Sequence, residues 1–169
     1  KHRGSVVFLG TTDCNGAPER WRGRKLVQEL GLQERTVGVF TMCANAGKKT
    51  LKLLPARIEQ AAGDASVRLE PHGFVATMTE PVEDESLTNL AKLRVQAASE
   101  TSWFAAQPAL APLLPKGLLT CNALVDKENA MYLRFLLDRW APQTLFRLNR
   151  EAARQGDDQL MTRALFKGH

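Results

Sequence analysis

The sequence has few of the residues on which enzymes and metal sites usually depend. Three cysteines and three histidines occur among 169 residues. Cys14, Cys43 and Cys121 are far apart, with no C-x-x-C pair and no zinc-ligand spacing. We therefore expect three reduced thiols, as in an intracellular protein, and no bound metal. No apolar run is long enough to span a bilayer, and no signal peptide is visible.

The opening stretch "KHRGSVVFLG" passes from basic residues directly into a strand-like run and contains no initiator Met. It therefore looks like an excerpt from a longer polypeptide. With 44% hydrophobic and 24% charged residues, the composition is that of a globular protein. The length suits one domain, or one domain with a helical appendage. We expect the protein in the cytoplasm or in the interior of an organelle.

Positive charge is unevenly distributed along the chain. The net charge is +5, to which residues 1–60 contribute +6 (11 Lys/Arg against 5 Asp/Glu), residues 61–100 contribute −4 (3 against 7) and residues 101–169 contribute +3 (9 against 6). A basic first third could meet phosphate, RNA or anionic lipid. Only Trp21, in "RWRGRK", interleaves an aromatic ring with these basic residues. We therefore expect a solvated basic face and no nucleic-acid partner.

Strand and helix patterns alternate through the first half of the chain. Buried strands are predicted at residues 5–12 and 35–41, and two short strands around Pro71-His72-Gly73. Helices are predicted at residues 19–32 and 48–62, the latter kinked or restarted at its internal proline. This alternation predicts an α/β fold with a mainly parallel sheet and crossover helices, buried on both faces.

After Pro81 the chain is predicted to be all helical. One helix begins at the acidic residues 83–85, which complement the helix dipole, with Asp84 or Ser86 as its cap. After a proline-rich break, a long helix with a broad apolar face follows, and Ala141-Pro142 interrupts it. Its apolar residues point in too many directions for one partner, so at least one should be exposed among Leu133, Phe135, Leu136 and Leu137. We expect residues 118–155 to self-associate or to take up partner helices.

Residues 35–50, "RTVGVFTMCANAGKKT", end in letters that look like a phosphate-binding loop. The pattern G-x-x-x-x-G-K-[ST] fails, because its first Gly would have to stand at Met42 and Lys49 occupies the Ser/Thr place. We therefore expect an ordinary loop that enters a helix. No other G-x-x-x-x-G-K-[ST] candidate occurs elsewhere in the sequence.

The order of these pieces resembles the second half of a dynamin-superfamily GTPase domain. "ERTVGVFT" is similar to that family's R-T-I-G-V-x-T strand, which runs into the guanine-reading motif T-K-x-D. "LEPHGFVATMTEP" stands where the family has G-Y-x-x-V-x-N-R-S. "ETSWFAAQP" resembles E-x-x-F-F-x-x-x-P, with Glu100, Trp103, Phe104 and Pro108 in register. "KGLLTCNALVDKENAMYLRFLLDRWAPQTLFRL" is similar to the segment that enters the family's helical bundle.

The resemblance implies a partial P-loop-GTPase-like sheet in residues 1–108 and helices leading into a bundle or stalk in residues 109–169. For the full-length protein it implies binding and hydrolysis of GTP with Mg²⁺. It also implies that hydrolysis is coupled to membrane remodelling, through peripheral association with a membrane.

The departures from the family fall on the residues that read the base. In T-K-x-D the Asp accepts hydrogen bonds from guanine and the Lys stem covers the base. Here Thr41 matches, but Met42 and Ala44 replace the Lys and the Asp, while Thr79 and Glu80 begin the segment that replaces N-R-S. Ala cannot accept those bonds, and losing a buried polar partner costs on the order of several kcal/mol of discrimination. These five residues are thus the predicted remains of a degenerate base loop, and we expect no catalytic residue.

Two other hypotheses stay open. In a pseudo-GTPase, the same fold would have lost its nucleotide chemistry and would serve as a scaffold or assembly module. In an unrelated intracellular α/β enzyme, Cys43 at the end of a parallel strand could be a reactive thiol. His72 has no predictable acid or nucleophile beside it, and the acidic residues 83–85 are interpreted as a solvated helix start rather than a cation site.

Overall fold

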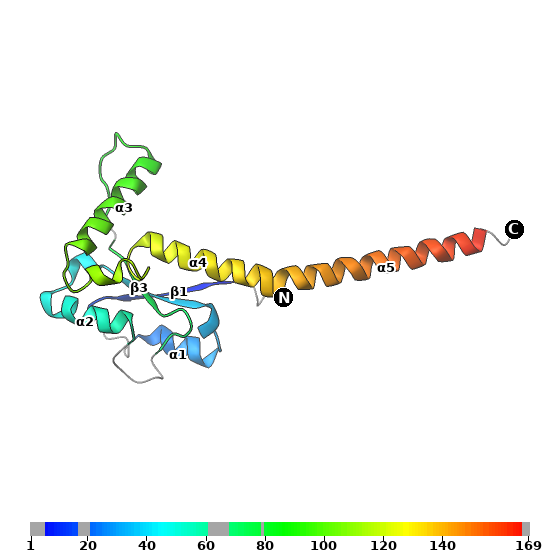
Figure 1. Cartoon of the computed structure of the whole chain (residues 1–169), viewed down its shortest axis with the longest axis horizontal. Coiled ribbons are helices and arrows are strands. Elements are labelled where there is room, and N and C mark those ends of the chain that lie inside the picture. Colours follow the sequence, from blue (N-terminus) through cyan, green and yellow to red (C-terminus); the bar gives the residue numbers. More distant parts are fainter. Residues whose placement is uncertain (1–5, 17–20, 61–67, 79, 167–169) are drawn as a thin grey trace. The chain divides into compact units, whose positions relative to one another are not determined.

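The computed structural model describes residues 6–16, 21–60, 68–78 and 80–166, with side chains described as far as residue 156. The chain forms two compact units, one containing Val6–Ala130 and the other containing the residues from Met131 onward. The first unit holds a small sheet with helices around it, and the second is helical (Figure 1).

Three parallel strands form the sheet of the first unit. In order across the sheet they are β1 (Phe8–Asp13), β2 (Thr36–Thr41) and β3 (Phe74–Ala76). β1 and β2 pair along their whole length, with Asp13 opposite Thr41, and β3 pairs with the middle of β2. The predicted α/β fold with a parallel sheet is confirmed, with three strands in the described part of the chain.

β2 is the buried centre of the sheet. Every residue from Thr36 to Phe40 is buried, and Phe40 stacks on Phe74 of β3 with ring centroids 4.8 Å apart. Gly38 leaves room for this pair, because a Cβ there would lie 2.2 Å from the Phe74 ring. β2 is therefore the continuous apolar strand that is typical of a parallel sheet covered on both faces.

β1 is not the buried strand that the sequence predicted. Phe8 is 38% exposed and Leu9 is 46% exposed. Consecutive residues of a strand point to opposite faces of the sheet, so both faces are open at this position. The physical reason is that β1 is the outer strand, with a strand neighbour only on the β2 side in the described part of the chain.

Helices α1 (Arg22–Glu29) and α2 (Lys48–Ile58) connect the strands and lie on one side of the sheet (Figure 1). α2 packs through Leu54, which is fully buried. The helix runs through Pro55 without restarting. It ends near Ile58, earlier than predicted, because Gln60 adopts a left-handed backbone conformation with φ 54°.

Only one of the two short strands predicted around Pro71-His72-Gly73 is formed among the described residues, and it is β3. Before the turn, Leu69 donates its N–H to Gln60 Oε1 at 2.7 Å, and the Leu69 carbonyl accepts from the N–H of Gly73. These bonds use the main-chain groups that a strand would need for its ladder. Residues 61–67 lie outside the described residues.

Helix α3 (Asn89–Ala105) begins later than predicted. Its cap is Thr88, whose hydroxyl accepts from the N–H of Ala91 at 3.3 Å. The two predicted cap residues bond to each other instead. Asp84 accepts hydrogen bonds from the N–H and the hydroxyl of Ser86 at 2.9 and 2.6 Å. Asp84 and Ser86 therefore close a turn ahead of the helix, and the prediction that either caps it is wrong.

The edge of β3 is covered by the segment that enters helix α4 (Cys121–Phe135). Ala76 donates its N–H to the Leu118 carbonyl at 3.0 Å, and its own carbonyl accepts from Thr120 at 2.9 Å. A 3₁₀ turn at Ala111–Leu113 precedes this contact. The start of α4 is thus attached directly to the sheet.

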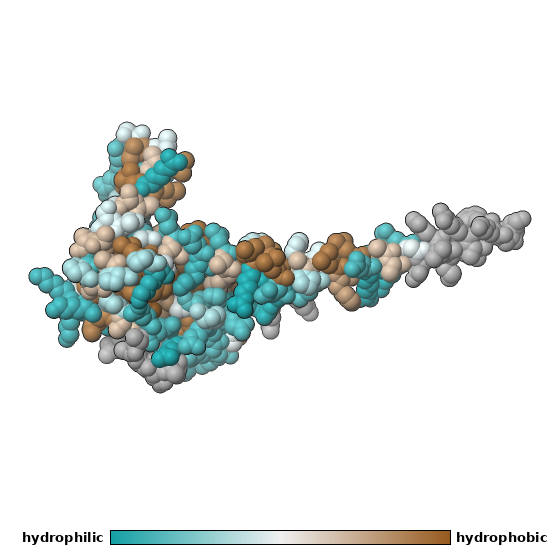
Figure 2. Space-filling view, in the orientation of Figure 1, coloured by the Kyte–Doolittle hydropathy of each residue, from teal (hydrophilic) through white to brown (hydrophobic). Residues whose placement is uncertain are grey.

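The second unit is a helix with one irregular turn. α4 passes through a π-helical turn at Leu136–Trp140 into α5 (Ala141–Phe166). The irregular turn thus lies just before Ala141-Pro142, and the helix is not interrupted at these two residues as predicted. Leu133 and Leu137 are 56% and 63% exposed, which confirms that at least one of the four predicted residues is exposed. Figure 2 shows apolar side chains along this helix. Among the side chains that the structure describes in this unit, the other large exposed ones are Tyr132, Trp140, Leu145, Phe146 and Leu148.

Candidate functional site

The predicted site residues lie at the carboxyl ends of the parallel strands, the edge at which α/β sheets bind ligands. Thr41 ends β2, and the segment of residues 42–47 that follows, here called the β2 loop, carries Met42 and Ala44. Glu80 follows β3 and is exposed. Thr79 lies outside the described residues.

Two of these side chains are used by the fold. Thr41 donates its hydroxyl to the Thr12 carbonyl at 3.3 Å, which ties β2 to β1. Ala44 is half-buried in a 3₁₀ turn and packs against the hydrophobic core. Met42 is 54% exposed and has a left-handed backbone with φ 58°. Among the predicted site residues that the structure describes, only Met42 and Glu80 are thus well exposed. A thioether and a carboxylate do not supply the contacts that T-K-x-D and N-R-S supply.

Cys43 lies in the core rather than at an open site. Its side chain is 0% exposed, and its thiol donates to the Phe40 carbonyl at 3.8 Å. Burial raises the pKa of this thiol well above its ordinary value, and the neighbouring Cys14 raises it further. A cysteine nucleophile needs the thiolate form. This environment therefore does not favour the hypothesis that Cys43 is a reactive thiol.

Arg57 closes the segment of residues 14–16, here called the β1 loop. Its Nη1 donates to the carbonyl oxygens of Cys14 and Gly16 at 3.0 and 3.2 Å, from the last turn of α2. These two carbonyls have left the strand ladder, and Arg57 satisfies both. No sequence pattern predicts this contact, because Arg57 lies on another element.

Glu100 is a buried carboxylate that joins two elements. It is 1% exposed, its Oε1 accepts from the N–H of Met78 at 2.7 Å, and its Oε2 accepts from the N–H of Cys121 at 2.7 Å. The first bond holds the chain just ahead of Glu80, and the second holds the first residue of α4. The N-terminal end of a helix favours a negative charge. Glu100 thus connects the β3 end of the candidate site to α4.

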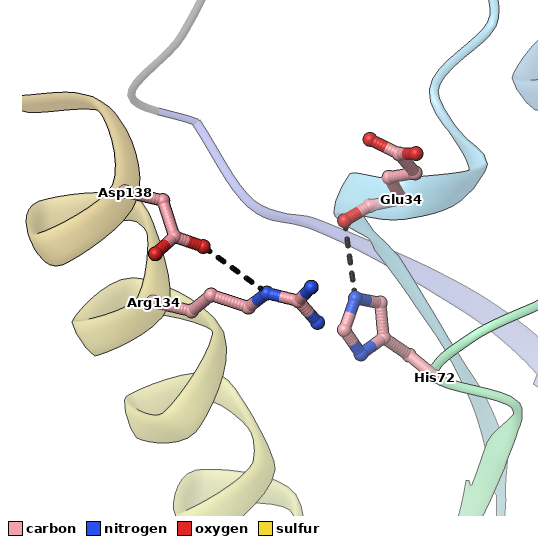
Figure 3. A network of polar contacts seen from close by, with 4 residues as sticks. All are labelled: Glu34, His72, Arg134 and Asp138. Carbon is pink, nitrogen blue, oxygen red and sulfur yellow. Dashed lines mark hydrogen bonds and ion pairs between the residues drawn. The ribbon is translucent and has the colours of Figure 1, made fainter.

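His72 has a structural environment. Its Nε2 lies 3.0 Å from the main-chain carbonyl oxygen of Glu34 (Figure 3). Its own carbonyl accepts from Lys127 Nζ at 2.6 Å, and burial lowers the pKa of that lysine. Figure 3 also draws a pair in the second unit, in which Arg134 Nε and Asp138 Oδ2 are 3.3 Å apart on adjacent turns. These contacts fix a turn and a helix.

No metal site forms among the described residues. They contain no group of three or more His, Cys, Asp or Glu side chains placed to hold an ion. In the acidic stretch, hydrogen bonds from the side chain and main chain of Ser86 lower the pKa of Asp84.

None of the described helices combines the length and the apolar character that crossing a bilayer requires.

Comparison with known proteins gives no further assignment. No family model matches this chain, and no curated protein sequence matches it.

Proposed function

We propose that this chain is the base-side half of a dynamin-like GTPase domain, with the first helices of its bundle, in which the guanine-reading loop has degenerated. The full-length GTPase would bind and hydrolyse GTP with Mg²⁺, using a phosphate loop outside this chain, and would couple hydrolysis to membrane remodelling. This chain would contribute the frame of the base side and no catalytic residue.

The position of Met42 and Ala44 carries this proposal. Both follow the central strand of the parallel sheet at its carboxyl edge, where a base-reading loop belongs. Met42 is more than half exposed there, so a lysine in its place would be free to lie over a bound base. Ala44 offers no acceptor to a guanine edge. This position supports the proposal of a base-side loop that has lost its recognition groups.

A pseudo-GTPase scaffold is the second candidate. It is favoured by the exposed carboxylate of Glu80, which would reverse the charge beside the base. It is also favoured by the exposed apolar residues of the second unit, which suit assembly with other helices. In this case the fold would act as an assembly module and would not hydrolyse a nucleotide.

Two measurements test these proposals. The first is the coding sequence upstream of Lys1, where an intact phosphate loop supports the GTPase and its absence supports the scaffold. The second is calorimetric titration of this chain with GTP and ATP, for which we expect no saturable binding. A low-micromolar dissociation constant for GTP would show that the base loop is not degenerate.

A matched pair of variants tests the position of the loop. In a longer chain that includes a phosphate loop, the double change Met42→Lys and Ala44→Asp should raise the preference for guanine over adenine nucleotides. The double change leaves the net charge unaltered, and Leu53→Lys, at an exposed position of α2, controls for the new lysine. If the double change leaves the preference where it was, this loop does not cover the base and the resemblance loses its main support.

A further inference from the structure

Cys14 and Cys43 lie side by side at the carboxyl ends of β1 and β2. The N–H of Cys14 donates to the Thr41 carbonyl at 3.2 Å, which extends the ladder by one residue. The Cys14 thiol donates to the Met42 carbonyl at 3.5 Å, and that carbonyl belongs to the peptide group of Cys43. Both side chains are 0% exposed and belong to one core cluster. The two thiols are also close enough to perturb each other's ionisation.

We infer that Cys14 and Cys43 form a redox pair, in which oxidation joins them by a disulfide and fastens the β1 loop to the β2 loop. The register that pairs Asp13 with Thr41 places Cys14 level with Met42, the residue before Cys43. Adjacent strands lie about 4.7–4.9 Å apart, and a disulfide spans Cα separations of about 4.4–6.8 Å. The third thiol, that of Cys121, lies 3.6 Å from Glu100 Oε1 at the start of α4. The inference is independent of the proposed nucleotide chemistry.

The oxidant is a small disulfide of the glutathione class. The thiolate of one cysteine attacks a sulfur of the reagent, which forms a mixed disulfide and expels one glutathione thiolate. The second cysteine then loses its proton and attacks the protein sulfur of the mixed disulfide, which forms the bond between Cys14 and Cys43 and expels the second glutathione. The protein loses two electrons and two protons, and the reagent becomes two thiols.

Arg57 controls access to the pair. Because both thiols are buried, the oxidant can reach them only when the β1 loop opens. Arg57 holds that loop closed through its hydrogen bonds to the carbonyls of Cys14 and Gly16. Removing the guanidinium leaves these carbonyls without their donor, so the loop should open more often. The resting chain is therefore slow to oxidise, and Arg57 sets how slow.

The test uses the full chain and oxidised glutathione at mildly alkaline pH. Samples are quenched with iodoacetamide over time and analysed by intact mass and peptide mapping. We expect the wild-type chain to lose two hydrogen atoms and to yield a peptide containing Cys14 joined to Cys43, and the Cys121→Ser variant to do the same. Arg57→Met should form this bond several-fold faster, whereas Arg22→Met, which removes an exposed cation from α1, should not change the rate.

The decisive measurement is on the wild-type chain and does not depend on any variant folding. If Cys14 and Cys43 both stay reduced while Cys121 in the same sample is converted to its mixed disulfide, the pair is not redox-active and the inference fails. It fails equally if Cys121 is found joined to either of them. Equal rates of disulfide formation in wild type and Arg57→Met would show that Arg57 does not control opening of the β1 loop.

Discussion

Replacing Glu100 by Gln should break one of the two bonds that hold the end of β3 to the start of α4. The Glu100 carboxylate uses one oxygen for the N–H of Met78 and the other for the N–H of Cys121. Gln keeps one carbonyl oxygen and replaces the other oxygen with an NH₂ group. One main-chain N–H would then face another donor, and at 1% exposure water cannot take the place of the lost acceptor.

The expected cost follows from these two bonds. A hydrogen bond to a charged group is worth about 1.5–3 kcal/mol, and an unsatisfied buried donor costs about 1–3 kcal/mol. Part of this loss of stability is offset, because Gln, unlike the Glu carboxylate, does not bury a charge. We expect Glu100→Gln to lower the free energy of unfolding by about 2–3 kcal/mol. Glu100→Ala should lower it by about 4 kcal/mol, since both bonds are lost and a cavity is left.

Urea unfolding followed by tryptophan fluorescence measures this loss, because Trp21 and Trp103 pack against the core of the first unit. The control is Glu85→Gln, an exposed position where we expect a change within about 0.5 kcal/mol. Hydrogen exchange at the Met78 and Cys121 amides should accelerate in Glu100→Gln. If that variant is as stable as the control, the carboxylate is not a structural link and the reasoning is wrong.

Two further predictions concern the second unit and the core thiols. The chain should self-associate through the exposed apolar residues of its second unit. Leu137→Glu should therefore lower the mass measured by light scattering, whereas the control Gln143→Glu should leave it unchanged. A stable monomer that binds no hydrophobic dye would contradict this prediction. Stability should fall as the pH rises above 9.0, because burial raises the pKa of Cys43 above that ordinary value and only the unfolded chain then loses the proton. Relative to Cys43→Ala, the wild type should lose up to about 1.4 kcal/mol per pH unit, and equal pH slopes in urea unfolding would contradict it.

The sequence was informative where neighbouring residues decide the outcome. The apolar run at Thr36–Thr41 predicted the central strand, and alternation with helices predicted its parallel neighbours. The failed phosphate-loop pattern at Met42 and Lys49 also needed no coordinates, because the pattern requires particular residues at fixed spacing. What the loop does for a nucleotide stays a prediction.

Tertiary structure decided the burial of β1 and the place where α3 begins. An apolar run such as residues 5–12 has the same pattern in a central strand and in an outer one, and only the number of neighbouring strands separates the two. Asp84, Ser86 and Thr88 are all good caps by type. Thr88 is the residue whose hydroxyl reaches the first turn of α3, since Asp84 and Ser86 bond to each other.

Only the folded chain brought together the buried polar groups. Arg57 binds carbonyls that are 43 and 41 residues away, and Glu100 binds amides that are 22 and 21 residues away. Cys14 and Cys43 became neighbours because the register of β1 against β2 sets their strand ends side by side. Local sequence fixes the preference of each segment for helix or strand, whereas these contacts depend on register and helix placement, which result from packing of the whole core.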